Sequence, residues 1–435
     1  MFRKIASCVM VTAAFAAMSV PSVAIAAPSL KNCQQILAKY PNGVAKNRAG
    51  VVRAVALGYA APAVQSAVYA GARKLDRNKN GSVCVLEANK RTPLAGLNAP
   101  SVTSASEPAV SGHPAVSSAQ AGAVGAAGGM CMVAMRNGRI VGEWYFNGGT
   151  PTSRYVPASS SKPAVAAVVG AAIQLGRLRL DQSAADFIPE WKGTPKAAIT
   201  VRHLLTHTSG LKATLFDTGP AFYSTAGTSS ATAIRLPLVS TPGSVFDYDS
   251  STLVLQVLVR VVERAVGESY RTFAEKYVFR PTGMSNTGYV GDDPSSNGAS
   301  GDPSLGTGLN TTCRDLARLG QLFHQKGRWE SQQIFSSEFA TQATSAQVTN
   351  AVLPNTGAAS YGFLHSFQFD TVGHLGGCGH VLATMPSGVT VAMMSNDTYQ
   401  PSLPAALARQ SSPLCALPRT VAVTQAALAV ARLNL

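Results

Sequence analysis

Two residues three positions apart, Ser159 and Lys162, are the pair in this 435-residue chain best suited to covalent chemistry. They stand at the predicted start of a helix, where this spacing places both side chains on one face. A buried lysine loses its proton readily and can then act as a base toward the serine hydroxyl. Neither Ser160 nor Ser161 has a lysine at the same spacing. Taken alone, such a pair is more often a solvated helix start than a catalytic site. Other motifs in the chain are needed to distinguish the two interpretations.

Three runs downstream of this pair carry a family resemblance. They are GRLRLD at 176–181, IPEW at 188–191 and TVRHLLTHTSGL at 200–211, the last being highly specific. From about residue 131 to 400 the chain resembles the serine hydrolases related to class C β-lactamases and D-alanyl-D-alanine peptidases. This group includes family VIII-type esterases and aminohexanoate-oligomer hydrolases. The resemblance implies an α+β fold, with a β-lactamase/transpeptidase-like antiparallel sheet flanked by helices and an inserted helical lobe. It also implies that Ser159 is the nucleophile and that Lys162 activates it.

The second element of the family is Tyr-x-Asn, and here the chain has Tyr248-Asp249-Ser250 after a turn. The resemblance implies that Tyr248 exchanges protons with the nucleophile and the leaving group. Ser250 departs from the pattern at a substrate-binding position. A hydroxyl cannot supply both arms of an amide in one fork. The departure therefore weakens the case for β-lactam or peptide recognition and favours an ester.

The third element is His374-Leu375-Gly376-Gly377. In this family a Lys- or His-x-Gly strand lines the cleft, which implies that His374 faces the substrate. Gly376 would allow close approach of the backbone. The N–H of Gly377 would pair with that of Ser159 to form an oxyanion hole, the set of donors that binds the developing negative charge.

Two histidines in the 200–211 run, His203 and His207, could be imagined as metal ligands at helical spacing. The resemblance implies a structural role for both instead. It implies a structural role also for residues 310–318, which match a family landmark at the start of a helix.

A second motif lies near the N-terminus. Asp76, Asn78, Asn80 and Glu87, with Gly81 at the turn, fit the alternation of oxygen ligands in a calcium loop. Residues 30–87 resemble the extracellular calcium-binding excalibur domain, which usually has three Asp and a Glu directly after the second Cys. This chain has two Asn and Val85 at those places, so we expect weak, structural Ca²⁺ binding and no cofactor for catalysis.

The first 26 residues have a basic start, an apolar stretch and a small-residue cleavage site at 24–26. They predict a secretory signal peptide and a secreted or periplasmic protein. No later segment is long and apolar enough to predict a transmembrane span. The net charge of +15 predicts non-specific contact with acidic envelope components. Because the basic residues are dispersed, a specific nucleic-acid site is not expected.

Six cysteines follow the signal peptide, an even number that favours disulfides in an oxidising compartment. Cys33 and Cys84 bracket the small domain and are expected to pair. The other four allow three pairings, which the sequence leaves open: Cys131, Cys313, Cys378 and Cys415.

The chain divides into a calcium-binding domain at 27–90, a flexible Ala/Ser/Pro/Gly linker at 91–127 and the hydrolase domain at 128–435. Two β-prone runs around Asn137-Gly138 predict a hairpin. Helices are expected at 163–178, 253–265 and 313–323, and strands at 380–384 and 389–395. Strands at both ends of the domain suggest that they share one sheet.

These patterns together predict an exported serine hydrolase that acts through a Ser-Lys-Tyr acyl-enzyme mechanism on a small ester or amide. Two other functions remain open at this point. One is a cell-wall D-peptidase or β-lactamase. The other is a non-catalytic, calcium-dependent envelope-binding protein that keeps the hydrolase fold.

Overall fold

The computed structural model describes residues 112–213, 229–290, 301–349, 360–368, 370–395 and 417–433, with residues 351 and 353 and short stretches between residues 44 and 83. The chain divides into two units, Met1–Pro93 and Leu94–Leu435. Several sequence-based expectations lie outside the described residues: the signal peptide, the calcium ligands Asp76, Asn78, Asn80 and Glu87, and the Cys33–Cys84 pair.

Three two-residue strands form a small sheet in the first unit. They are β1 (Val44–Ala45), β2 (Ala63–Val64) and β3 (Ser82–Val83), in the order β2-β1-β3. β1 pairs with β2 in parallel and with β3 antiparallel.

A seven-stranded antiparallel sheet organises the second unit, in the order β10-β11-β12-β13-β14-β4-β5. Its strands are β4 (Gly129–Arg136), β5 (Arg139–Tyr145), β10 (Ser360–Tyr361), β11 (Ser366–Gln368), β12 (Thr371–Leu375), β13 (Val381–Thr384) and β14 (Thr390–Ser395). β14 pairs with β4, which confirms that strands from both ends of the domain share one sheet.

The hairpin of β4 and β5 forms where the sequence predicts it. Asn137 and Gly138 connect the strands with φ angles of +52° and +76°. Two successive residues with positive φ are what a type I′ turn requires, and its twist matches that of the strands. The Asn-Gly pair therefore determines locally how β4 and β5 are connected.

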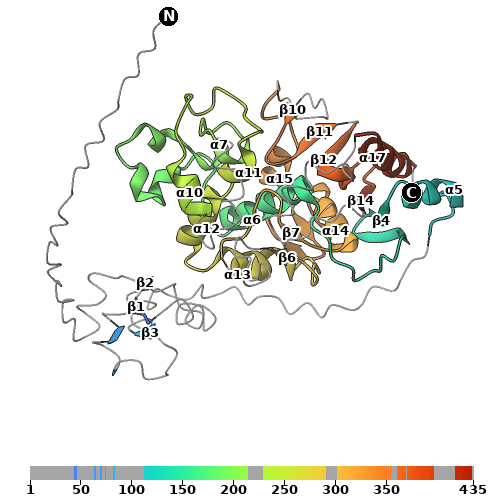
Figure 1. Ribbon diagram of the computed structural model, residues 1–435, viewed down its shortest axis with the longest axis horizontal. Helices are drawn as coiled ribbons and strands as arrows, with labels where there is room; N and C mark the ends of the chain where they lie inside the picture. The colour runs from blue at the N-terminus through green and yellow to red at the C-terminus, as the bar shows by residue number, and fades with distance from the viewer. Residues whose placement is uncertain are drawn as a thin grey trace, which may run out of the picture. The chain divides into compact units, whose positions relative to one another are not determined.

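Helices cover both faces of the sheet (Figure 1). On β4, Met132 and Ala134 face a cluster with α5 (Ser118–Ala126) and α17 (Leu417–Ala431). The alternate residues Val133 and Met135 face the main core, which contains α6 (Lys162–Gln174) and α14 (Cys313–His324). Since successive strand residues point to opposite faces, an apolar run such as β4 serves both layers.

The predicted linker at 91–127 is wrong at its C-terminal end. Residues 118–126 form α5, which begins at a capping box between Ser117 and Gln120. Val116, Ala121 and Val124 are buried against the sheet. Alanine is the strongest helix former and valine supplies apolar surface, so this part of the low-complexity segment gains enough burial to fold.

An inserted lobe of short helices packs on the other side of α6. It contains α7 (Val201–Leu205), α10 (Ser229–Arg235), α11 (Ser251–Val254), α12 (Val257–Val266), α13 (Tyr270–Ala274) and the π-helix η6 (Glu275–Phe279). The sequence predicts a single helix at 253–265, but the structure has two helices, α11 and α12, with a break at Gln256.

Smaller elements complete the unit. They are the 3₁₀ helices η3 (Ala184–Asp186), η4 (Pro189–Trp191) and η5 (Pro195–Ala198), the helix α15 (Ser337–Ala343), and the strand pairs β6–β7 (Gly288–Tyr289, Leu309–Asn310) and β8–β9 (Arg328–Trp329, Gln332–Gln333). Among the described residues, none of the helices has the length and apolar character needed to cross a bilayer.

A disulfide bond joins Cys131 on β4 to Cys313 at the start of α14. It selects one of the pairings that the sequence left open. The two cysteines are 182 residues apart, so their link would lower the entropy of the unfolded chain enough to stabilise the fold by about 5 kcal/mol.

Candidate active site

Ser159 and Lys162 lie together where a short 3₁₀ helix, η2 (Ala158–Ser161), runs directly into α6. The amine Nζ of Lys162 is 2.9 Å from the hydroxyl Oγ of Ser159 and donates a hydrogen bond to it. Ser159 is partly exposed, whereas Lys162 is fully buried. The spacing of three residues therefore brings the two groups into contact, with only the serine reachable from outside.

Burial changes the acidity of Lys162. Loss of solvation lowers the pKa of its ammonium from 10.5 to about 7. Its second hydrogen bond goes to the carbonyl oxygen of Gly306 at 3.1 Å. Among the described residues no carboxylate forms an ion pair with it. A large part of the population therefore carries a neutral amine at neutral pH, with a lone pair available as a base.

The carbonyl of Gly306 is held in place by Gln256, at the break between α11 and α12. The Gln256 side chain donates to the carbonyl of Pro303 at 2.9 Å and accepts from the N–H of Leu305 at 2.8 Å. A Cβ atom at Gly306 would lie 2.9 Å from the Cα of Thr252, so this residue has to be glycine. Sequence reasoning missed Gln256, because its role depends on a loop about fifty residues away.

Tyr248 completes the cluster from the lobe. The Nζ atom of Lys162 lies 4.9 Å from the centre of the Tyr248 ring. The hydroxyl of Tyr248 is 3.2 Å from Nε2 of His374. Burial raises the pKa of this phenol above its usual value, and a hydrogen bond with the Ser159 side chain only partly opposes that rise. Tyr248 therefore stays protonated over the physiological range and can supply a proton.

Gly376 and Gly377 meet the start of η2 from the end of β12. A Cβ atom at Gly376 would lie 2.3 Å from the carbonyl oxygen of Pro157, so only glycine fits this approach. At Gly377, a Cβ atom would be 3.9 Å from that of Ala158. Ser159 and Gly377 both stand in the first turn of a 3₁₀ helix, where N–H groups have no partner inside the helix. The two 3₁₀ helices that carry these N–H groups lie in contact with each other.

The backbone just before Ser159 is strained. Ala158 has φ of +46°, a conformation that costs a non-glycine residue free energy and is concentrated at functional sites. The hydroxyl of Ser160 donates to the carbonyl of His374 at 2.7 Å, and that of Ser161 accepts from the N–H of Leu309 at 3.1 Å. The two buried serines therefore anchor the strained turn to neighbouring strands.

The beta-lactamase family matches residues 118–412 of this chain, more than half of its length. The chain belongs to the beta-lactamase family. Its match begins at α5, which agrees with the structural finding that this helix is part of the domain.

Similar proteins include a curated esterase and two solved structures. The chain is 34% identical over 156 residues to Esterase EstB of Burkholderia gladioli; the match covers 32% of this chain and 38% of the esterase. The structure of EstCE1, described as a hydrolase with promiscuous acyltransferase activity, superimposes with a TM-score of 0.52 at 20% identity, covering 71% and 96% of the two chains. The structure of a penicillin-binding protein homologue from Caulobacter crescentus superimposes with a TM-score of 0.55 at 18% sequence identity. This match covers 74% of the present chain and 99% of the homologue. The two structures establish the shared fold.

Two of the expected substrate contacts are turned inward in this beta-lactamase-family domain. Ser250 is 1% exposed; its hydroxyl donates to Asp247 at 2.8 Å and accepts from the N–H of Ala213 at 3.0 Å. His374 is 2% exposed, and both ring nitrogens have partners inside the protein. Both side chains thus make hydrogen bonds within the protein, and their role toward the substrate stays a prediction.

The two histidines of the 200–211 run also bind within the protein. The ring of His203 accepts from the N–H of Thr200 and caps α7, a structural use. His207 is buried, and its Nε2 lies 3.2 Å from the hydroxyl of Tyr361, a residue that sequence reasoning missed. Within the described ranges no group of three or more His, Cys, Asp or Glu side chains could hold a metal ion.

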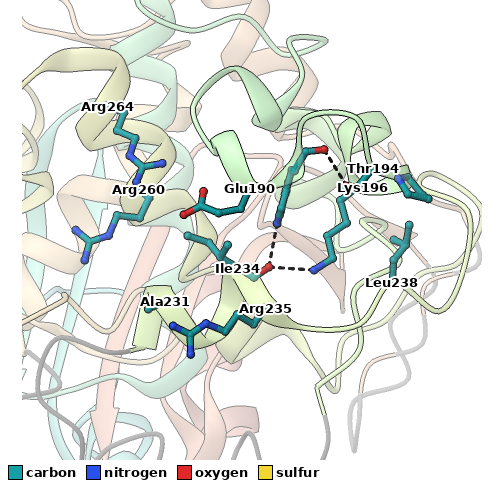
Figure 2. A pocket seen from close by; sticks show the side chains of 11 residues that line it. Glu190, Thr194, Lys196, Ala231, Ile234, Arg235, Leu238, Arg260 and Arg264 are labelled. Carbon is teal, nitrogen blue, oxygen red and sulfur yellow. Dashed lines mark hydrogen bonds between the residues drawn. The ribbon is translucent and has the colours of Figure 1, made fainter. Parts of the chain in front are cut away.

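A cavity of about 540 Å³ lies elsewhere in the domain, between η4, α10 and α12 (Figure 2). Four cationic side chains line it: Lys196, Arg235, Arg260 and Arg264. Most of these charges are already engaged. Arg260 pairs with Glu263 at 2.7 Å and with Asp302 at 3.2 Å, and Lys196 donates to the carbonyl of Ile234 at 3.0 Å. Neither Ser159 nor Lys162 lines this cavity, so it is separate from the cluster described above.

Proposed function

We propose that this protein is an exported serine hydrolase that cleaves small esters through a covalent acyl-enzyme. One observation carries the proposal most: the Nζ atom of Lys162, buried without a carboxylate partner among the described residues, lies 2.9 Å from the hydroxyl of Ser159. A base with a pKa near the working pH, in contact with a nucleophile, is what general-base activation requires.

In the first step the carbonyl of the ester binds to the N–H groups of Ser159 and Gly377. Ser159 Oγ bonds to the carbonyl carbon while Lys162 takes the hydroxyl proton. The negative charge that forms on the carbonyl oxygen is stabilised by the two N–H donors. The tetrahedral species then collapses, and the bond to the alcohol oxygen breaks.

The alcohol needs a proton as it leaves. Tyr248 supplies it, because its raised pKa keeps the hydroxyl protonated. The Lys162 ammonium then returns a proton to Tyr248. Water attacks the acyl-enzyme in the second half of the reaction, and the same two groups carry its proton back to Ser159. The net result is one acid, one alcohol and the unchanged enzyme.

An ester is favoured over an amide by the state of Ser250. The hydrogen of its hydroxyl is donated to Asp247 within the protein, so the side chain has no donor left for the carbonyl of a peptide amide. The likeness to a Burkholderia gladioli esterase points the same way. A cell-wall D-peptidase or a β-lactamase is the second candidate, which the likeness of fold to a penicillin-binding protein homologue supports.

A fluorophosphonate probe tests the proposal. It should label Ser159 in the intact protein, and Ser159→Ala should lose both the label and ester hydrolysis. Loss of the nucleophile in a serine protease costs roughly a million-fold in rate. Ser160→Ala is the matched control and should keep the label. Absence of labelling would instead favour the non-catalytic binding protein.

A substrate panel then separates the two enzymatic candidates. Short-chain esters should be cleaved faster than cephalosporins or D-Ala-D-Ala peptides. Efficient cleavage of a β-lactam would overturn the argument from Ser250. We also propose that the first 26 residues direct export, and that Asp76, Asn78, Asn80 and Glu87 bind a weak structural Ca²⁺ that takes no part in the chemistry.

A further inference from the structure

A row of buried rings, those of His374, Tyr361 and His207, leads away from the hydroxyl of Tyr248. The hydroxyl of Tyr361 lies between two histidines, 3.4 Å from Nε2 of His374 and 3.2 Å from Nε2 of His207. The same Nε2 of His374 is 3.2 Å from the hydroxyl of Tyr248. All three residues behind Tyr248 are buried, at 2% exposure or less. The positions of their hydrogens follow from the partners of each nitrogen.

The ring of His374 has a defined tautomer. Its Nδ1 is 3.0 Å from the carbonyl oxygen of Leu375, which can only accept a hydrogen bond. Nδ1 therefore carries the hydrogen. Burial, and then the charge of Lys162, lower the pKa of this imidazole well below its usual value, so the ring is neutral and Nε2 has no hydrogen. Its single lone pair faces two hydroxyls, those of Tyr248 and Tyr361, and can accept fully from only one of them.

The ring of His207 decides which hydroxyl donates. Its Nδ1 has no hydrogen-bond partner among the residues that the structure describes. A neutral ring has one N–H group, and an unpaired buried N–H is rarer than an unpaired buried acceptor. The hydrogen therefore belongs on Nε2, from which it is donated to the oxygen of Tyr361. Burial lowers the pKa of His207 well below its usual value too, which keeps the ring neutral.

The order of the protons then follows along the row. Tyr361 accepts from His207, so it directs its own hydrogen to Nε2 of His374 and fills that lone pair. We propose that His207 and Tyr361 are positioning residues that prevent His374 from capturing the hydroxyl hydrogen of Tyr248, which stays available to the leaving group. This inference rests on the proposed hydrolase function.

The backbone around His207 supports a specific placement. Its φ is +55°, which is unusual for a residue other than glycine. The carbonyl of His207 accepts from the N–H of Asp247, the neighbour of Tyr248, at 2.8 Å. The ring also packs edge-on against Tyr248, with centroids 5.4 Å apart. His207 is therefore tied to the segment that carries Tyr248 through both its backbone and its ring.

Histidine tautomers can be read directly by ¹⁵N–¹H correlation spectroscopy of the resting protein with labelled histidine. We expect His374 in the Nδ1–H form and His207 in the Nε2–H form. An Nδ1–H form of His207 would reverse the order of the protons and overturn the proposal. This measurement does not depend on catalysis, so it stands even if the protein proves to cleave another substrate.

Tyr361→Phe tests the consequence for the reaction. Without the Tyr361 hydroxyl, Tyr248 should donate to His374, and its hydrogen should no longer be available. For an alkyl ester, whose alcohol needs a proton, we expect kcat to fall by about tenfold, the effect of about 1.4 kcal/mol on the barrier, with little change in KM. For a 4-nitrophenyl ester, whose phenolate leaves without a proton, the rate of acylation should hardly change.

The contrast between the two esters separates positioning from general damage. A loss of structure would slow both esters equally, and that result would overturn the proposal. Tyr270→Phe is the matched control: Tyr270 is as fully buried as Tyr361 but lies in the lobe on α13. It should leave both rates unchanged. Fluorophosphonate labelling of Ser159 in Tyr361→Phe should persist, because fluoride also leaves unprotonated. Failure to label the parent protein would refute the hydrolase function instead.

Discussion

Lys162 in the candidate active site and Arg260 at the basic cavity are basic residues in opposite surroundings. Arg260 is partly exposed and has two acidic partners, Glu263 and Asp302. Lys162 is fully buried and donates hydrogen bonds to a hydroxyl and a carbonyl, those of Ser159 and Gly306. A guanidinium stays protonated with or without such partners, and the two carboxylates hold Arg260 in place. Burial without a carboxylate partner, in contrast, lowers the pKa of Lys162 to about 7.

This contrast shows that the number of cations around a cavity does not locate the chemistry. Four basic side chains line that cavity, and of these Arg260 is paired with two carboxylates. Lys162, fully buried and without a carboxylate partner among the described residues, is a group that can lose its proton in the working range. Each of the following predictions tests one side of this comparison.

The largest expected effect is that of removing the uncompensated amine. Lys162→Met should lower kcat/KM for esters by about 10²–10⁴, the usual contribution of a general base. Lys196→Met, in the basic cavity, should change the rate by less than about twofold, because this partly buried side chain does not contact Ser159 or Lys162. Steady-state kinetics of the two purified variants make the test. Equal losses in both would show that the comparison is mistaken.

The pH profile should report the same group. Above its pKa of about 7 Lys162 is neutral and can accept the Ser159 proton, and below it the amine is protonated and inactive. Between pH 6 and 8 we therefore expect kcat/KM to rise by about tenfold. The profile should show no descending limb in this range, since the raised pKa of Tyr248 keeps that phenol protonated. A rate that falls as pH rises would mean that the protonated amine is required.

On the other side of the comparison, Arg260→Met should affect stability and not chemistry. Asp302, at 5% exposure, would lose its ion pair and keep a hydrogen bond from the N–H of Ser230. We expect the free energy of unfolding to fall by about 1–3 kcal/mol, with kcat unchanged. Denaturant unfolding and ester kinetics on the same preparation measure both. A large loss of kcat would link the cavity to the active site.

The smallest effect is expected from calcium. In the proposed calcium loop Asp76 and Glu87 would supply the negative charge and Asn78 and Asn80 are neutral, so we expect weak binding. Calcium at ten times its Kd should stabilise the first unit by about 1.4 kcal/mol. Thermal unfolding of the full chain should show this gain, and Glu87→Gln should abolish it. Ester hydrolysis should be insensitive to a chelator; a sensitive rate would mean that calcium supports the chemistry.

Local features were predictable from the sequence because neighbouring residues decide them. The hairpin at Asn137-Gly138 and the helix from Cys313 formed as expected. The Ser159–Lys162 contact follows from helical spacing alone. The helix α5 was missed because its alanines resemble linker composition, and only packing against the sheet shows that they are buried.

Pairings between distant segments were beyond the sequence. Cys131 could have bonded to any of three partners, and the packing of α14 against β4 selects Cys313. Likewise, nothing near Gln256 in the chain indicates that it holds the loop ending at Gly306. These contacts depend on how elements settle against each other.

The sequence by itself determined the family, the order of the motifs and the identity of the reactive pair, since these depend on residue types and short spacings. Tertiary structure decided the acidity of Lys162, the inward use of Ser250 and His374, and the alignment of His207 with Tyr361. The physical reason is desolvation. A side chain's pKa and its free hydrogen-bonding capacity depend on what surrounds it in space, and the chain supplies those surroundings only when it folds.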